Sequence, residues 1–108
     1  MGKVYGPTIK KLQRAINDKF DYRVLVNKTQ FYSEDSCRVL EYISVKRSIY
    51  DEEKKKNRNI ELFSSSSDVQ IVLYLRDLWY ELNGWEVPTD NEKWVKAKQK
   101  WMEKHANG

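Results

Sequence analysis

Apolar side chains recur at helical spacing near the start of the chain, in its second half and at its end. The first stripe, formed by Ile9, Leu12 and Ile16, predicts a helix over about 7–19. The second stripe is wider and predicts the main core helix; its members are Ile71, Val72, Leu75, Leu78, Trp79 and Leu82. In the third, Trp94, Val95, Ala97, Lys98, Trp101 and Met102 lie at helical spacing.

Short motifs predict where the last two helices begin and where the middle one ends. Ser67 and Gln70 have the spacing of a capping box, and Asn83-Gly84 is a stop signal of the left-handed type. Thr89 and Glu92 have the same box spacing ahead of the last helix.

Between the first and second helices, β-branched and aromatic residues alternate with polar ones. This pattern predicts strands over 22–26, 38–50 and 60–62. The middle segment carries apolar side chains on both faces, so we expect it to be the central strand. Asn27-Lys28 is interpreted as a turn, and residues 51–59 as a charged turn.

The elements together predict the fold class α+β, in the order α-β-β-β-α-α. Three consecutive strands with short connections favour an antiparallel meander, packed by helices. The 108 residues suit a single domain, 1–108, with its core in 7–83. The last helix, over about 90–104, is expected to pack at an end of the domain or on a partner.

Composition excludes several classes of protein. Apolar residues make up 40% of the chain, enough for a modest core. No apolar run approaches the roughly 18 residues of a membrane span, and the N-terminus has no signal-peptide pattern. We therefore expect a cytoplasmic protein without membrane contact. One cysteine excludes an internal disulfide, and one cysteine with one histidine argues against a zinc site.

The net charge of +4 is distributed unevenly along the chain. Residues 1–59 carry 14 basic and 8 acidic side chains, whereas residues 60–89 carry one basic and five acidic. Residues 90–108 carry five basic and three acidic. A polarised surface would steer charged partners, while solvated faces of differing composition are the alternative interpretation.

Motifs for catalysis are missing from the sequence. It has no phosphate-binding loop and no nucleophile elbow. A nucleophilic pair would need Cys37 and His105, but we expect His105 in a frayed C-terminal tail and Cys37 as a small apolar residue at the start of a strand. We expect no enzymatic activity, no cofactor and no metal. A magnesium-dependent nuclease stays as a minor alternative, because carboxylates are frequent between Glu34 and Glu61.

A binding function fits the pattern better. Six cations surround one predicted hairpin and can neutralise phosphates without reading base sequence: Lys46, Arg47, Lys54, Lys55, Lys56 and Arg58. The alternative is that lysines at hairpin tips protect sheet edges from aggregation. Trp94 and Trp101 share a helix face and are secondary candidates for partner contact, with packing inside the domain as the alternative.

The element order over residues 7–83 resembles the double-stranded RNA-binding domain. That family carries a basic cluster at the start of its last helix. The corresponding stretch here, residues 64–70, has no lysine or arginine.

Three stretches carry a second resemblance: Thr29-Gln30-Phe31-Tyr32-Ser33-Glu34, Glu61-Leu62-Phe63-Ser64-Ser65, and the run from Leu75 to Pro88, LRDLWYELNGWEVP. They resemble small proteins of Gram-positive phages and conjugative elements, of the anti-CRISPR type. The element order, with Asn83-Gly84-Trp85 after the second helix, is also similar to a known Cas9 inhibitor that is acidic and mimics DNA.

The resemblance implies a non-enzymatic mobile-element protein that inhibits a type II CRISPR–Cas system in the host bacterial cell. Its partners would be the Cas9 nuclease or its guide RNA, bound stoichiometrically. The alternative is a nucleic-acid-binding accessory or regulatory protein of a phage or conjugative element. Oligomeric state and the inhibited step are left open.

Overall fold

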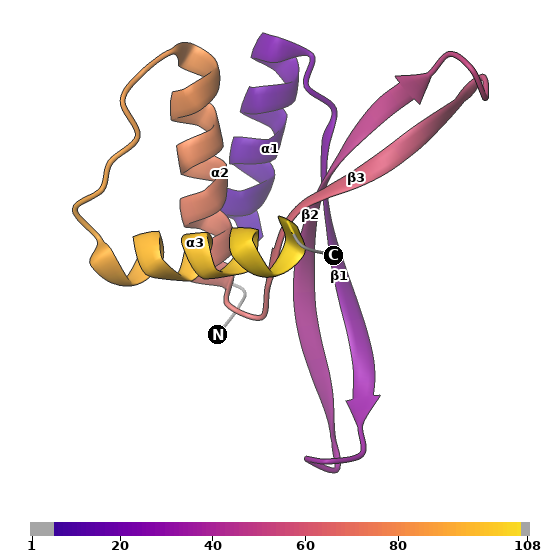
Figure 1. Ribbon diagram of the computed structural model, residues 1–108, viewed down its shortest axis with the longest axis vertical. Helices are drawn as coiled ribbons and strands as arrows, with labels where there is room; N and C mark the ends of the chain where they lie inside the picture. The colour runs from indigo at the N-terminus through magenta and orange to yellow at the C-terminus, as the bar shows by residue number, and fades with distance from the viewer. Residues whose placement is uncertain (1–5, 107–108) are drawn as a thin grey trace.

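The longest strand lies in the middle of the sheet, as its sequence predicts. In the computed structural model, which describes residues 6–106, β1 (Val24–Ser33), β2 (Arg38–Asp51) and β3 (Lys56–Ser65) form an antiparallel meander in the order β1-β2-β3 (Figure 1). β1 pairs with β2 residues 38–47, and β3 pairs with residues 43–51. Three strands therefore lie side by side only at positions 43–47.

β2 continues past this short three-stranded part at both ends, so the sheet has two projecting hairpins. We call residues 29–42 the β1–β2 arm and residues 48–59 the β2–β3 arm (Figure 1). The pairing of β2 with β3 shifts between Val45 and Lys46, and such a bulge increases local twist. The arms raise the radius of gyration to 15.1 Å, against about 13 Å for a compact domain of this length.

Three helices complete the predicted order α-β-β-β-α-α: α1 (Gly6–Phe20), α2 (Asp68–Asn83) and α3 (Glu92–Ala106). α1 and α2 run in the same direction, and their C-terminal ends meet where Phe20 packs edge-on against Trp79 at 5.6 Å. Lys19 Nζ donates to Asn83 Oδ1 at the same place. Within residues 6–106, no helix has the length and apolar content needed to cross a bilayer.

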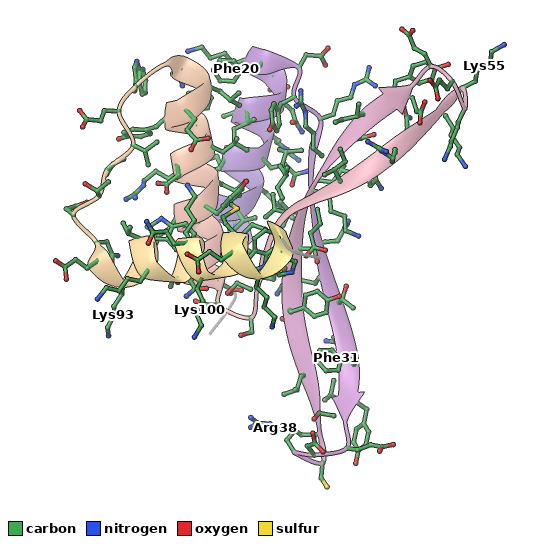
Figure 2. The ribbon with its side chains drawn as sticks, in the orientation of Figure 1. Phe20, Phe31, Arg38, Lys55, Lys93 and Lys100 are labelled. Atoms are coloured by element: carbon green, nitrogen blue, oxygen red, sulfur yellow. The ribbon has the colours of Figure 1, made fainter. Side chains whose placement is uncertain are left out.

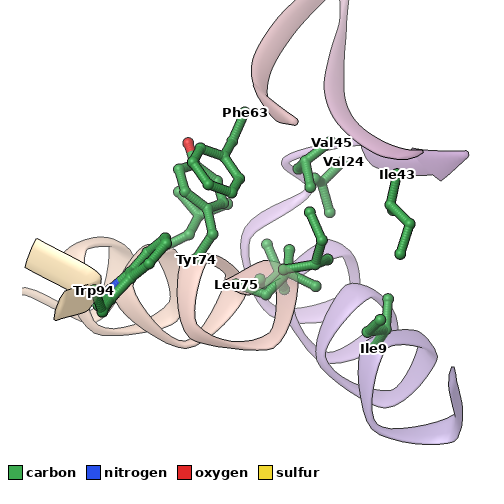
Figure 3. Packing of buried hydrophobic residues seen from close by; sticks show 11 residues of the cluster. Ile9, Val24, Ile43, Val45, Phe63, Tyr74, Leu75 and Trp94 are labelled. Atoms are coloured by element: carbon green, nitrogen blue, oxygen red, sulfur yellow. The ribbon is translucent and has the colours of Figure 1, made fainter. Parts of the chain in front are cut away.

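The core has an aliphatic and an aromatic part (Figure 3). The predicted stripes of α1 and α2 pack on the three-stranded part of the sheet, with Ile9, Ile43 and Leu75 buried. On the side of α3, Phe63 stacks on Tyr74 at 4.9 Å and meets Trp94 edge-on at 5.4 Å. Burial raises the pKa of the Tyr74 hydroxyl. α1 and α2 therefore cover one face of the sheet.

Two predicted turns are wrong. Asn27-Lys28 continues β1, and the charged turn assigned to 51–59 covers only residues 52–55. In both places the side chains meet solvent: Asn27 and Lys28 are exposed although they pair with the three-stranded part of β2, and residues 56–59 belong to the two-stranded β2–β3 arm. Polar residues therefore fill the strand, and the alternation of apolar with polar positions that sequence reasoning depends on is lost.

The helix ends follow the sequence in part. Ser67 caps α2, with its Oγ accepting from the Gln70 backbone N–H, while the Gln70 side chain accepts from Ser65 Oγ rather than closing the predicted box. Gly84 ends α2 in the left-handed conformation, as predicted. The predicted Thr89 cap is wrong: Asn91 caps α3, accepting from the Trp94 N–H at 3.2 Å.

α3 packs on the domain through a buried carboxylate. Asp77 is 2% exposed; its Oδ2 accepts from Trp94 Nε1 at 2.8 Å and from Lys98 Nζ at 3.2 Å. Its Oδ1 accepts from Arg76 Nη2 at 3.1 Å. A buried charge is tolerated when its lone pairs are used in this way. The open question of what the last helix packs on is thereby answered: it docks on α2 and the end of β3.

We expect Asp77→Ala to lower the free energy of unfolding by about 3 kcal/mol, because the indole N–H and two cations lose their acceptor. Chemical denaturation measures the loss, and hydrogen exchange should show weaker protection along α3. The exposed Asp18→Ala is the matched control and should cost less than about 0.5 kcal/mol. A loss below about 1 kcal/mol for Asp77→Ala would contradict this role.

Gly84 provides a second test of the local structure. Its φ of +76° is strained for other residues, but a Cβ built there has no atom within 4 Å. Gly84→Ala should therefore cost only the conformational term, about 1 kcal/mol, and Gly84→Asn less. Equal stabilities for all three proteins in thermal unfolding would show that the left-handed cap is not needed.

Candidate binding surface

Four of the six predicted cations gather at the end of the β2–β3 arm. Lys54 and Lys55 lie in its turn, Lys56 begins β3, and Arg58 follows two residues later. Asp51 closes the turn, since its Oδ1 accepts from the backbone N–H groups of Glu53 and Lys54. Figure 2 shows Lys55 at the outermost point of this arm. All four cationic side chains are exposed.

These four cations have no acidic partner among the residues whose side chains the structure describes, 7–105. Lys56 stands opposite Asp51 in the strand register, yet no carboxylate oxygen lies within 4.0 Å of any of the four. Lys55 also has a φ of +52°, in the region that favours glycine or asparagine. Residues 48–59 of the arm carry these four cations and three acidic residues, Asp51, Glu52 and Glu53, so the net charge of the arm is +1 and its cations are exposed without a close ion pair.

The other two predicted cations do not join this cluster. Lys46 and Arg47 are adjacent in β2, so their side chains lie on opposite faces of the sheet. Arg47 serves the fold: its guanidinium lies 3.9 Å from the centre of the Tyr22 ring, and its Nε donates to the Tyr22 carbonyl. Four of the six predicted cations therefore form a cluster at the arm tip, and Lys46 and Arg47 lie apart from it, at the base of the arm.

The prediction of partner contact by Trp94 is wrong, because its side chain is buried against Phe63 and Asp77. The alternative, packing inside the domain, is what the structure has. Trp101 is half-buried: it packs on Phe63, donates to Ser64 Oγ at 3.1 Å, and is covered on one side by the His105 ring. The helical spacing places both indoles on one face, and that face is the docking face of α3.

The β1–β2 arm carries large exposed side chains that are mostly apolar. Phe31 is 46% exposed and Tyr32 and Val39 are each 62% exposed. Gln30 and, from the base of the arm, Lys28 contact Glu41 and lower the pKa of its carboxyl. The arms therefore differ in charge: residues 29–42 carry one basic and three acidic side chains, and residues 48–59 carry four basic and three acidic.

A second set of cations that the sequence reasoning did not assign to a site lies on α3. Lys93, Lys96, Lys100 and Lys104 are all exposed, and the signal that could have found them is their helical spacing. Among residues 7–105 they too have no carboxylate within 4.0 Å.

Cys37 and His105, the pair that nucleophilic catalysis would need, lie on different elements of the described structure. Cys37 lies in the turn of the β1–β2 arm, where its thiol donates to the Glu34 carbonyl, whereas His105 is on α3. Between residues 6 and 106, no three His, Cys, Asp or Glu side chains are placed to hold a metal ion. The described surface presents exposed cations and exposed apolar side chains.

Comparisons with family models, curated proteins and solved structures find no match for this chain.

Proposed function

We propose that this protein is a non-enzymatic inhibitor of a type II CRISPR–Cas system, which binds guide-loaded Cas9 stoichiometrically through the β2–β3 arm. The arm would contact the phosphate backbone of the guide RNA. The observation that carries the proposal is the cluster of four exposed cations at the arm tip, Lys54, Lys55, Lys56 and Arg58, none of which has a carboxylate oxygen within 4.0 Å among residues 7–105.

The geometry of the arm supports contact with a polyanion. Lysines without a close ion pair bind phosphates as point charges and read no base sequence. The two-stranded arm extends beyond the helices, so its tip can approach an RNA held within a larger protein without a clash from the rest of the domain (Figure 1). A lysine at position 55, where glycine would be less strained, is consistent with a need for charge at the tip.

The identity of the partner rests on the resemblance of residues 29–34, 61–65 and 75–88 to small anti-CRISPR-type proteins of phages and conjugative elements. A stoichiometric inhibitor needs a rigid surface and no catalytic group. The described residues offer such a surface in the arm, whose turn is fixed by Asp51.

The proposal is tested by DNA cleavage with guide-loaded type II nucleases of Gram-positive bacteria, titrated with this protein. The native chain should suppress cleavage by one of them near equimolar ratio. The charge-reversed triple variant K54E/K55E/K56E should need at least about 100-fold more protein, because like charges placed against phosphates cost several kcal/mol. Arg47 is left unchanged because it supports the fold.

The matched control is K10E/K11E/R14E, which reverses three exposed cations on α1 and changes the net charge equally. It should inhibit as the native chain does. Failure of the native chain on every nuclease tested, or full inhibition by the arm variant, would refute the proposal.

A second candidate function, a nucleic-acid-binding accessory protein of a mobile element, is favoured by the lysines of α3. It differs in requiring affinity for free nucleic acid, whereas the inhibitor needs none. The cleavage titration separates the two functions, because an accessory protein would bind free nucleic acid without suppressing cleavage near equimolar ratio, whereas the inhibitor suppresses it.

A further inference from the structure

We infer that the exposed face of α3 is a second, separate binding surface, which takes the phosphate backbone of a nucleic-acid duplex without regard to base sequence. We call Lys93, Lys96, Lys100 and Lys104 the lysine ridge. They fall within an arc of about 80° around the helix axis and span about 17 Å along it. Figure 2 shows Lys93 and Lys100 projecting from the same side of α3.

The ridge is held rigidly, because the opposite face of α3 is fixed to the domain. Trp94 and Lys98 donate to Asp77, and Trp101 donates to Ser64. Lys98, the fifth lysine of α3, lies on this inner face, where its Nζ forms ion pairs with Asp77 and Glu81 of α2. The carboxylates of α2 therefore compensate Lys98, and the four lysines of the ridge are left for a ligand.

Helix stability explains little of the ridge. Like charges at i,i+3 and i,i+4 destabilise a helix by about 0.2–0.5 kcal/mol each, and the ridge has three such neighbouring pairs. Lys93 lies in the first turn of α3, where the helix dipole disfavours a cation, and only Lys104 lies in the last turn, where the dipole favours one. Glu92 and Glu103, the acidic residues of α3, lie beside the ridge on the helical wheel, but neither has a carboxylate oxygen within 4.0 Å of a ridge lysine.

The surroundings of the lysine ridge indicate which class of ligand it binds. Binding of single strands relies on aromatic side chains that stack on bases, and the indoles of α3 face the core. An anionic membrane surface would need a free apolar face beside the lysines, and that face is used for docking. A straight, rigid row of point charges matches the ordered phosphates of a duplex.

The inference is tested by titrating the whole protein with a 20-base-pair DNA duplex and an RNA duplex of unrelated sequences, at several salt concentrations. Four phosphate contacts give a slope of log K against log salt of about −3.6. K96Q/K100Q/K104Q should flatten the slope by about 2.7 and weaken binding at 0.1 M salt by about tenfold or more. Circular dichroism should show an unchanged fold, since these side chains are exposed.

The matched control is K10Q/K11Q/R14Q, which removes the same charge from exposed positions of α1. If it binds the duplexes as the native chain does while the ridge variant loses affinity, the ridge is the duplex site. Equal loss in both variants, loss in the α1 variant alone, or no duplex binding by the native chain would overturn the inference. In the cleavage assay the ridge variant should still suppress cleavage as the native chain does, so a loss of duplex binding is distinguished from failure of the proposed function.

Discussion

β2 is longer than the layer of helices is wide, and the rest of the structure depends on this difference. Only positions 43–47 of this strand have neighbours on both sides, and Ile43, Ser44 and Val45 are buried there. Past these positions the strand can pair on one side only, so the chain continues as two hairpins that the helices do not cover. One fold thus provides a small core and two long exposed surfaces, with the bulge after Val45 turning the second arm away.

A core of this width needs additional support, and α3 provides it. Its two indoles enclose Phe63, and Asp77 holds the helix in place with its hydrogen bonds fully used. A buried carboxylate is a weak source of stability but a strong constraint on geometry, because any other position of α3 would deprive Asp77 Oδ2 of its donors Trp94 and Lys98. The same constraint fixes which lysines of α3 face outward.

The sequence predicts features that depend on neighbouring residues better than features that depend on contacts between distant parts of the chain. The helices are found because Ile9 and Ile16, or Ile71 and Leu75, repeat at the period of a buried face. The outer half of β1 is missed because Asn27–Gln30 is polar, and its pairing with β2 is not written in the local pattern. Thr89 and Asn91 are both good caps, and the choice between them is made by the docking of Trp94 on Asp77, 17 residues away.

The candidate site shows the same division. The sequence locates the cations of the β2–β3 arm, since they are adjacent in the chain, but it cannot say that Arg47 is stacked on Tyr22. It places Trp94 and Trp101 on one face without telling whether that face is inside. Local spacing defines a set of residues, while only the tertiary contacts decide which of them are free to bind.

The central claim is that the protein acts by placing the tip of the β2–β3 arm against its partner. Hydrogen–deuterium exchange of the native chain, alone and with an equimolar amount of guide-loaded nuclease, tests it most directly. The account predicts slower exchange at the backbone amides of residues 52–58 in the complex, with the N-terminal half of α1 unchanged. Protection confined to other parts of the chain, or no protection at all, would contradict it.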